Sequence, residues 1–185
     1  MRSCLSLCVV IMAVHFFAPA EEGKAVLDFT LDSIDGKPYA LSQHKGEVLL
    51  LVNVASKCGF TPQYDGLEKI YKKYHDKGLT VIGIPANEFG AQEPGTNDEI
   101  KKFCTAKFNV TFPMLAKVVV KGDGICPLYK YLTEKGPKPG PIAWNFNKFL
   151  VDRNGVAIER YESKVAPESK ELTDAIEKAL AEKAK

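Results

Sequence analysis

The chain has 185 residues, of which 45% are hydrophobic and 26% are charged, and its formal net charge is +2. This length and composition predict one globular domain with a substantial hydrophobic core. The near balance of charge, without a basic cluster, argues against a nucleic-acid-binding protein and against recognition of a strongly acidic partner.

The first twenty residues have the pattern of a secretory signal peptide. Arg2 is the only charged residue among them, an apolar run occupies 5–17, and Ala-Pro-Ala at 18–20 supplies small residues before a cleavage site. The run is short for a membrane-spanning helix, which makes an uncleaved anchor the less favoured alternative. We therefore expect residues 1–20 to be removed and residues 21–185 to form one exported domain, periplasmic, secreted or in the ER lumen, without stable membrane insertion.

Strand and helix patterns alternate through the first half of that domain. Residues 29–41 predict a hairpin, because an Asp-Gly pair suits a tight turn between two short strands. The apolar run 48–55 is typical of a central parallel strand buried on both faces. A helical pattern over 63–77 and a second apolar run over 79–85 complete a strand–helix–strand unit.

The second half begins with a capping box from Thr96 to Glu99, which predicts a helix to about residue 107. We then expect a short helix over 127–134, strands over 146–151 and 156–161, and a last helix over 168–183 whose apolar stripe is Leu172, Ile176 and Leu180. This order predicts an α/β protein with a thioredoxin-like fold, in which helices flank a central mixed sheet and an extra hairpin precedes it.

Cys58 follows the first buried run and precedes the first helix. Open α/β sheets bind their ligands at this edge, and a helix N-terminus together with the neighbouring Lys57 would favour a thiolate over a thiol. Position alone leaves two readings equally open, a reactive cysteine and a small buried apolar residue.

Three segments resemble the signatures of the glutathione peroxidase family, in the family's order. They are Asn53-Val-Ala-Ser-Lys-Cys-Gly-Phe-Thr61, Gly83-Ile-Pro-Ala-Asn-Glu-Phe-Gly-Ala-Gln-Glu-Pro-Gly95 and Trp144-Asn-Phe-Asn-Lys-Phe-Leu150. The resemblance covers essentially all of residues 21–185 and implies a peroxidase.

The resemblance also implies a catalytic group of four residues: Cys58, Gln92, Trp144 and Asn145. The amide and indole N–H groups of the last three are neutral donors that can stabilise a thiolate and the oxygen that leaves a peroxide. Without the resemblance, a core tryptophan and loop-bonding amides would be the favoured reading of these three.

Several positions depart from the family pattern. Ala86 stands where many members carry cysteine, and Glu88 stands where glutamine is common. Many animal members carry selenocysteine at the reactive position, so Cys58 implies a slower nucleophile.

Cys104 lies in a segment, residues 103–113, that is similar to the one carrying the resolving cysteine in the thioredoxin-dependent, non-selenium branch. The resemblance implies that Cys104 attacks the Cys58 sulfenic acid to form a disulfide; the alternative is a buried, inert thiol. A disulfide requires Cα atoms within roughly 7 Å, so we predict local unfolding of residues 96–108 during turnover. Cys126 is given no role.

The segment 133–143 is short, whereas tetrameric animal members carry an insertion there that covers the site. This implies a monomer with an open site for hydrogen peroxide and for organic or lipid hydroperoxides, reduced in turn by a thioredoxin-like protein or by glutathione. No cofactor is expected, nor a bound metal, because residues 21–185 contain only His44 and His75 and no ligand-like spacing. A redox relay to a client protein and a non-catalytic binding module are the alternative functions.

Overall fold

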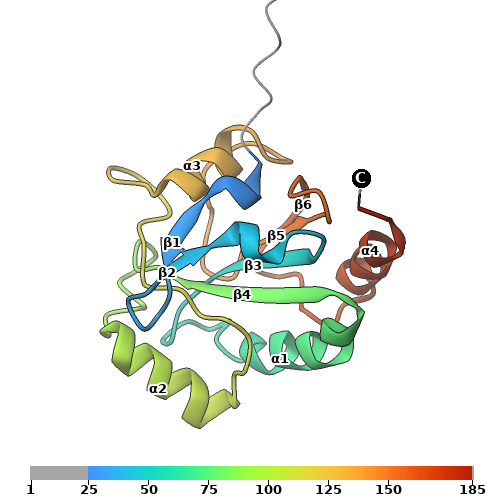
Figure 1. Cartoon of the computed structure of the whole chain (residues 1–185). Coiled ribbons are helices and arrows are strands. Elements are labelled where there is room, and N and C mark those ends of the chain that lie inside the picture. Colours follow the sequence, from blue (N-terminus) through green and yellow to red (C-terminus); the bar gives the residue numbers. More distant parts are fainter. Residues whose placement is uncertain (1–24, 185) are drawn as a thin grey trace, which may run out of the picture.

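The computed structural model describes residues 25–184, so the expected signal peptide lies outside the described residues. A four-stranded sheet in the order β4-β3-β5-β6 forms the centre of the molecule (Figure 1). Its strands are β3 (Val48–Val54), β4 (Leu79–Pro85), β5 (Lys148–Val151) and β6 (Ala157–Tyr161). The strand β3 pairs in parallel with β4 and antiparallel with β5, which confirms the predicted mixed sheet.

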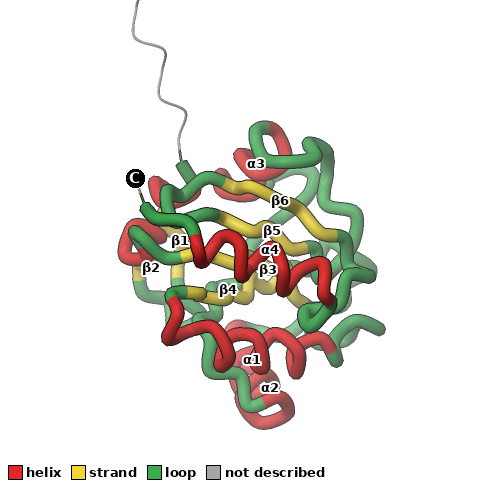
Figure 2. Tube along the Cα trace, turned by 90° about the vertical axis from the view of Figure 1, so that its right-hand side faces the viewer, coloured by secondary structure: helices red, strands yellow, loops and turns green. Residues whose placement is uncertain are grey.

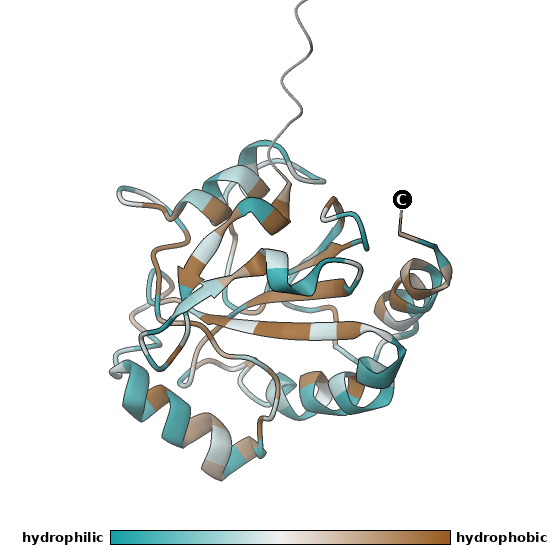
Figure 3. Cartoon of the chain, in the orientation of Figure 1, coloured by the Kyte–Doolittle hydropathy of each residue, from teal (hydrophilic) through white to brown (hydrophobic). Residues whose placement is uncertain are grey.

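The sheet separates two hydrophobic clusters. Along β3, Leu50 and Val52 belong to one cluster and Leu49 and Leu51 to the other, so every residue of this strand is buried. Successive side chains of a strand point to opposite faces, which explains why a central strand has a continuous apolar sequence. Figure 3 shows the same concentration of hydrophobic residues on β3 and β4.

Helices cover the two faces of the sheet unequally. One face carries α1 (Gln63–Tyr74) and α4 (Lys170–Ala181), which lie side by side in Figure 2. The other face carries α3 (Pro127–Glu134) and the predicted hairpin of β1 (Thr30–Asp32) and β2 (Pro38–Ala40). None of the helices within residues 25–184 is long and apolar enough to span a membrane.

The remaining helix, α2 (Asn97–Phe108), lies at the edge of the molecule beyond α1 (Figure 1). It begins with the predicted capping box, in which the Thr96 hydroxyl accepts the Glu99 N–H and the Glu99 carboxylate accepts the Thr96 N–H. Only Ile100, Cys104 and Phe108 of this helix are buried. A narrow apolar stripe is therefore what attaches α2 to the core.

Several predicted boundaries differ from the structure by one to three residues: α1 ends at Tyr74, β6 begins at Ala157 and α4 ends at Ala181. The strand β5 begins at Lys148 and not at residue 146, because Phe146 has a left-handed backbone (φ 64°) and donates its N–H to Asn53 O. The helix α4 begins after Ser169, whose hydroxyl accepts the Leu172 N–H. Its third buried position is Ala179, while Leu180 is only partly buried.

We expect Gly155→Ala to destabilise the protein more than Gly122→Ala. Both glycines have positive φ, 79° and 82°, so both substitutions incur the strain of a left-handed conformation, about 1 kcal/mol. A Cβ at Gly155 would lie 2.6 Å from Leu27 Cγ, whereas a Cβ at Gly122 meets nothing within 4 Å. The overlap should cost Gly155→Ala a further ~1–3 kcal/mol in the free energy of unfolding. Equal losses in urea titrations would contradict this account.

Candidate active site

Cys58 lies in the loop between β3 and α1, residues 55–62, which we call the reactive loop. The residue is 7% exposed and belongs to the cluster on the α1 side of the sheet. Its N–H donates to Thr61 Oγ1 (2.9 Å), and the Thr61 hydroxyl donates to Ala55 O (2.8 Å). Thr61 thus folds the loop back onto the end of β3 and holds the thiol at the edge of the sheet.

The sulfur of Cys58 has one backbone donor directed at it. The Phe60 N–H donates to Sγ across 3.4 Å. The helix α1 begins at Gln63, as predicted, so its N-terminus lies several residues beyond Cys58 in the chain. The hydrogen-bond donor that contacts the sulfur is therefore an N–H of the reactive loop itself.

Gln92 lies on the loop that follows β4, beside the reactive loop. The Lys57 N–H donates to Gln92 O (3.0 Å), which ties the two loops together. The preceding Ala91 has φ 51°, a left-handed conformation that costs free energy in a non-glycine residue. The Glu93 N–H donates to Asn87 Oδ1 (2.8 Å) and closes the turn that holds Gln92 there.

Asn145 connects the third predicted segment to Gln92. It is fully buried, and its Nδ2 donates to Gln92 Oε1 (3.0 Å). This bond uses the acceptor of the Gln92 amide and leaves its NH₂ group without a protein acceptor in the described chain. Gln92 can therefore donate to a bound oxygen or to a thiolate.

Trp144 is the most exposed member of the group, with 40% of its surface accessible. Its ring lies against Phe89, with centroids 5.8 Å apart, and its carbonyl accepts from Asn53 Nδ2 (3.1 Å). Within residues 25–184, no direct hydrogen bond joins Cys58 Sγ to Gln92, Trp144 or Asn145. The four residues are brought to one sheet edge through the bonds between their loops.

A buried polar network that the sequence did not predict supports this arrangement. Asn147 Nδ2 donates to Ser163 Oγ (3.1 Å), and the Ser163 hydroxyl donates to Asn145 O. Arg160 donates to the carbonyls of three residues that precede Trp144: Lys138 (3.0 Å), Gly140 (2.8 Å) and Pro141 (2.7 Å). A signal was available in Asn147, a polar residue at the start of an apolar strand pattern, but its partners are distant in the sequence.

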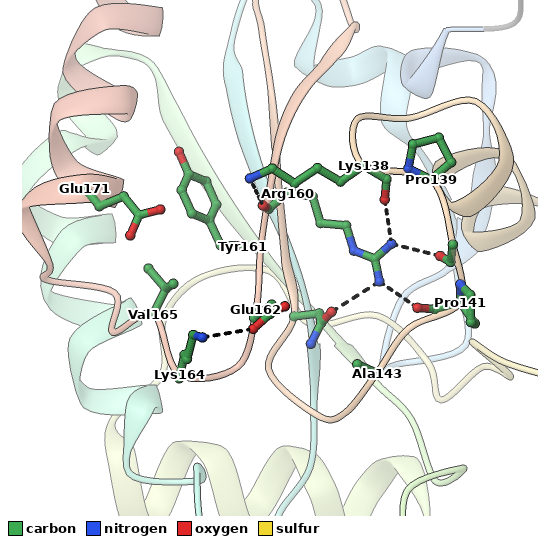
Figure 4. A pocket seen from close by; sticks show the side chains of 12 residues that line it. Lys138, Pro139, Pro141, Ala143, Arg160, Tyr161, Glu162, Lys164, Val165 and Glu171 are labelled. Atoms are coloured by element: carbon green, nitrogen blue, oxygen red, sulfur yellow. Dashed lines mark hydrogen bonds and ion pairs between the residues drawn. The ribbon is translucent and has the colours of Figure 1, made fainter.

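A pocket of about 550 Å³ lies beside that network (Figure 4). Most of its walls come from the segments 138–143 and 160–165, and Asn147 and Glu171 complete the lining. Figure 4 shows the Arg160 guanidinium turned toward the loop carbonyls, so its donors are already used. We therefore interpret Arg160 as the residue that holds the short segment before Trp144, and not as a ligand-binding cation.

Lys148 is an unexpected charge-bearing group under the site. The residue is fully buried in β5, and its Nζ donates to Phe146 O (2.8 Å), the carbonyl of the strained residue next to Asn145. Burial lowers the pKa of Lys148 to about 7, because the ammonium loses its water and gains no carboxylate.

Cys104 lies on α2 as a free thiol that is only 1% exposed. Burial raises the pKa of Cys104 to about 11, and the charge of Glu93 acts in the same direction, while the neighbouring Tyr64 hydroxyl opposes it. A thiol with this pKa stays protonated at neutral pH. Cys104 therefore cannot act as a nucleophile while α2 is packed in this position.

The third free thiol, Cys126, is partly buried at the start of α3, and burial raises its pKa. Among residues 25–184, no three His, Cys, Asp or Glu side chains gather so that they could hold a metal ion.

Comparison with known proteins gives an independent result. The family model described as glutathione peroxidase matches residues 26–133. The hydroperoxy fatty acid reductase gpx1 of Synechocystis sp. is 46% identical over 169 residues, which cover 87% of this chain and 99% of that protein. The glutathione peroxidase-like peroxiredoxin HYR1 of Saccharomyces cerevisiae is 51% identical, over 80% of this chain and 91% of its own.

Solved structures agree with these matches. The crystal structure of Trgpx in apo form superposes with a TM-score of 0.73 at 36% identity and covers 88% of this chain and 99% of that one. A thioredoxin family thiol:disulfide interchange protein from Chlorobium tepidum has a TM-score of 0.63 at 20% identity, covering 85% of this chain and 96% of that one. The second likeness confirms the thioredoxin-like fold.

Replacing Lys148 by Met should remove a pH dependence of stability. The ammonium loses its proton at about pH 7 in the folded protein but near 10.4 in an unfolded chain. Between these pH values the unfolded chain binds more protons, so the wild-type free energy of unfolding rises with pH. We therefore expect the free energy of unfolding of wild type, measured by urea titration, to increase relative to that of Lys148→Met as the pH rises from 7 to 10. Lys130→Met, at an exposed position of α3, is the control and should follow wild type. If the free energy of unfolding of Lys148→Met changed with pH in parallel with that of wild type, the lowered pKa of Lys148 would be refuted.

Proposed function

The chain belongs to the glutathione peroxidase family, and from this premise we propose that Cys58 is the thiol with which this peroxidase reduces hydroperoxides. The observation that carries the proposal is the chain of bonds from the reactive loop to Gln92 and from Gln92 to Asn145. These bonds place neutral donors at the same sheet edge as a cysteine whose sulfur already accepts a backbone N–H.

In the first step, the Cys58 thiolate attacks the outer oxygen of the hydroperoxide. The S–O bond forms as the O–O bond breaks, so sulfur is oxidised to the sulfenic acid and the peroxide is reduced to an alcohol or to water. The leaving oxygen takes up a proton. The NH₂ group of Gln92 and the indole N–H of Trp144 stabilise the charge that develops on that oxygen.

In the second step, Cys104 reacts with the oxidised Cys58. The Cys104 sulfur bonds to the Cys58 sulfur, and the sulfenic oxygen leaves as water. Because Cys104 is buried and protonated on α2, this step requires α2 to leave its packed position. The short apolar stripe of α2 supports local unfolding of residues 96–108, since a few buried contacts hold this helix.

A dithiol protein of the thioredoxin type then reduces the Cys58–Cys104 disulfide and is itself oxidised to a disulfide. The short segment 133–143, held down by Arg160, leaves Trp144 exposed, and it offers few walls that could hold the tripeptide glutathione. The same openness suits bulky hydroperoxides, which agrees with the reductase name of the Synechocystis relative. The proposal also includes export, which rests on the signal-peptide pattern of residues 1–20. It further includes a monomeric state, which rests on the short segment 133–143.

Mass analysis after one equivalent of peroxide tests the two cysteines. Wild type should form a Cys58–Cys104 disulfide, and Cys104→Ser should stop at a Cys58 sulfenic acid that dimedone traps. Cys58→Ser should lose peroxide reduction by about a thousandfold or more. Cys126→Ser is the matched control and should behave as wild type. Absence of the bridge in wild type would exclude the two-cysteine cycle.

A side-by-side assay tests the reductant. With a thioredoxin system and with glutathione at equal thiol concentration, we expect much faster steady-state turnover with thioredoxin, because a protein dithiol resolves the mixed disulfide intramolecularly. Equal turnover with glutathione would contradict this preference. Slow turnover with both, together with a specific protein trapped on Cys58 in Cys104→Ser, would favour a redox relay.

A further inference from the structure

Glu93 is a buried carboxyl group for which the two steps above provide no role. It directly follows Gln92 and is 1% exposed. Within residues 25–184, neither carboxyl oxygen accepts a hydrogen bond of good geometry, although the N–H and hydroxyl of Ser56 lie close to the carboxyl group. Buried polar groups are nearly always hydrogen-bonded, and burial of an unpaired carboxylate carries a large cost in free energy.

The group lies in a groove of about 450 Å³ between the two elements that must separate during turnover. Ser56 and Lys57 of the reactive loop form one wall, and Ile100 and Phe103 of α2 form the other. The backbone of Glu93 is fixed at both ends, because its N–H donates to Asn87 and its carbonyl accepts from Lys117 Nζ (3.0 Å). The carboxyl group thus sits at the joint between the Cys58 loop and the Cys104 helix.

The surroundings of Glu93 favour its neutral form. Burial raises the pKa of Glu93, and the partly opposing influences of Ser56, Lys117 and Lys57 do not reverse this. The charged or titratable groups near it come from each neighbouring segment: Lys57 in the reactive loop, Tyr64 in α1, Glu99 and Cys104 in α2, and Lys117 after α2.

We propose that Glu93 is a positioning residue for the disulfide step: the neutral acid fits the closed groove, and the carboxylate favours release of α2, which brings Cys104 to oxidised Cys58. The inference rests on the proposed function and deepens it. Opening exposes the carboxyl group to water and releases its proton to solvent. In the closed state, burial keeps Cys104 protonated, so Cys104 stays inert until the helix moves.

Titration of Glu93 makes the opening of α2 depend on pH. The closed state binds the Glu93 proton more tightly than the open state, so opening becomes easier as the pH rises. Each unit by which closure raises the pKa of Glu93 gives about a tenfold larger opening equilibrium at high pH. A residue that merely fills space at this position would produce no such dependence.

Rapid-quench measurement of disulfide formation from pH 5 to 9 tests the proposal, with Glu93→Gln compared with wild type at each pH. The ratio of the variant's rate to that of wild type should be near one at pH 5 and fall by about tenfold or more toward pH 9. Glu99→Gln is the matched control, because Glu99 lines the same groove but is exposed, and glutamine preserves the capping box. A ratio that does not change with pH, or an equal fall in Glu99→Gln, would overturn the proposal.

Two further measurements separate the possible failures. The first measures the rate of Cys58 oxidation in the Cys104→Ser background, with and without Glu93→Gln. If Glu93→Gln slowed this oxidation as much as it slows disulfide formation, with the same pH dependence, a role specific to the disulfide step would be overturned. If wild type forms no disulfide at any pH, the two-cysteine cycle of the proposed function fails, and the role of Glu93 fails with it. The second measures backbone amide hydrogen exchange in reduced wild type, so its result does not depend on how a variant folds. After correction for the intrinsic exchange rate, the opening equilibrium of α2 should increase with pH, while that of α1 should not change. A flat α2 profile would refute the inference.

Discussion

The site depends on the junction between the end of β3 and residues 144–147. Asn53, fully buried in β3, donates from its side chain to Trp144 O and accepts the Phe146 N–H at its backbone carbonyl. Because β3 also leads into the reactive loop, this junction fixes Cys58 and Asn145 relative to one rigid strand. Preorganised donors stabilise developing charge only when they are held in this way.

The arrangement is maintained at a cost to stability. Ala91 and Phe146 adopt left-handed backbone conformations beside the predicted site residues, and Lys148 is buried with no carboxylate partner among residues 25–184. Strain and buried polar groups of this kind persist only where the surrounding structure over-determines them. Here the mixed sheet and the network around Arg160 provide that support.

The two cysteines of the proposed cycle belong to the same hydrophobic cluster but differ in how they are held. Cys58 lies on a loop with an N–H directed at its sulfur, whereas Cys104 is carried by α2 and is only 1% exposed. A nucleophile that acts first must be poised in the folded state, and one that acts second can be stored in protonated form until a helix moves. Glu93 lies between them, at the joint where that movement begins.

The sequence by itself determined the order of elements, the burial of β3 and the capping box at Thr96, since these follow from local periodicity and short-range bonding. The resemblance of the sequence to the glutathione peroxidase family also implied the four candidate catalytic residues, Cys58, Gln92, Trp144 and Asn145. Only the tertiary structure decided that a loop N–H contacts the thiol, that Arg160 holds the segment before Trp144, and that the Glu93 carboxyl group is buried between the reactive loop and α2. Such contacts join residues far apart in the chain, and a linear pattern carries no record of which distant groups the packing of the sheet and helices brings together.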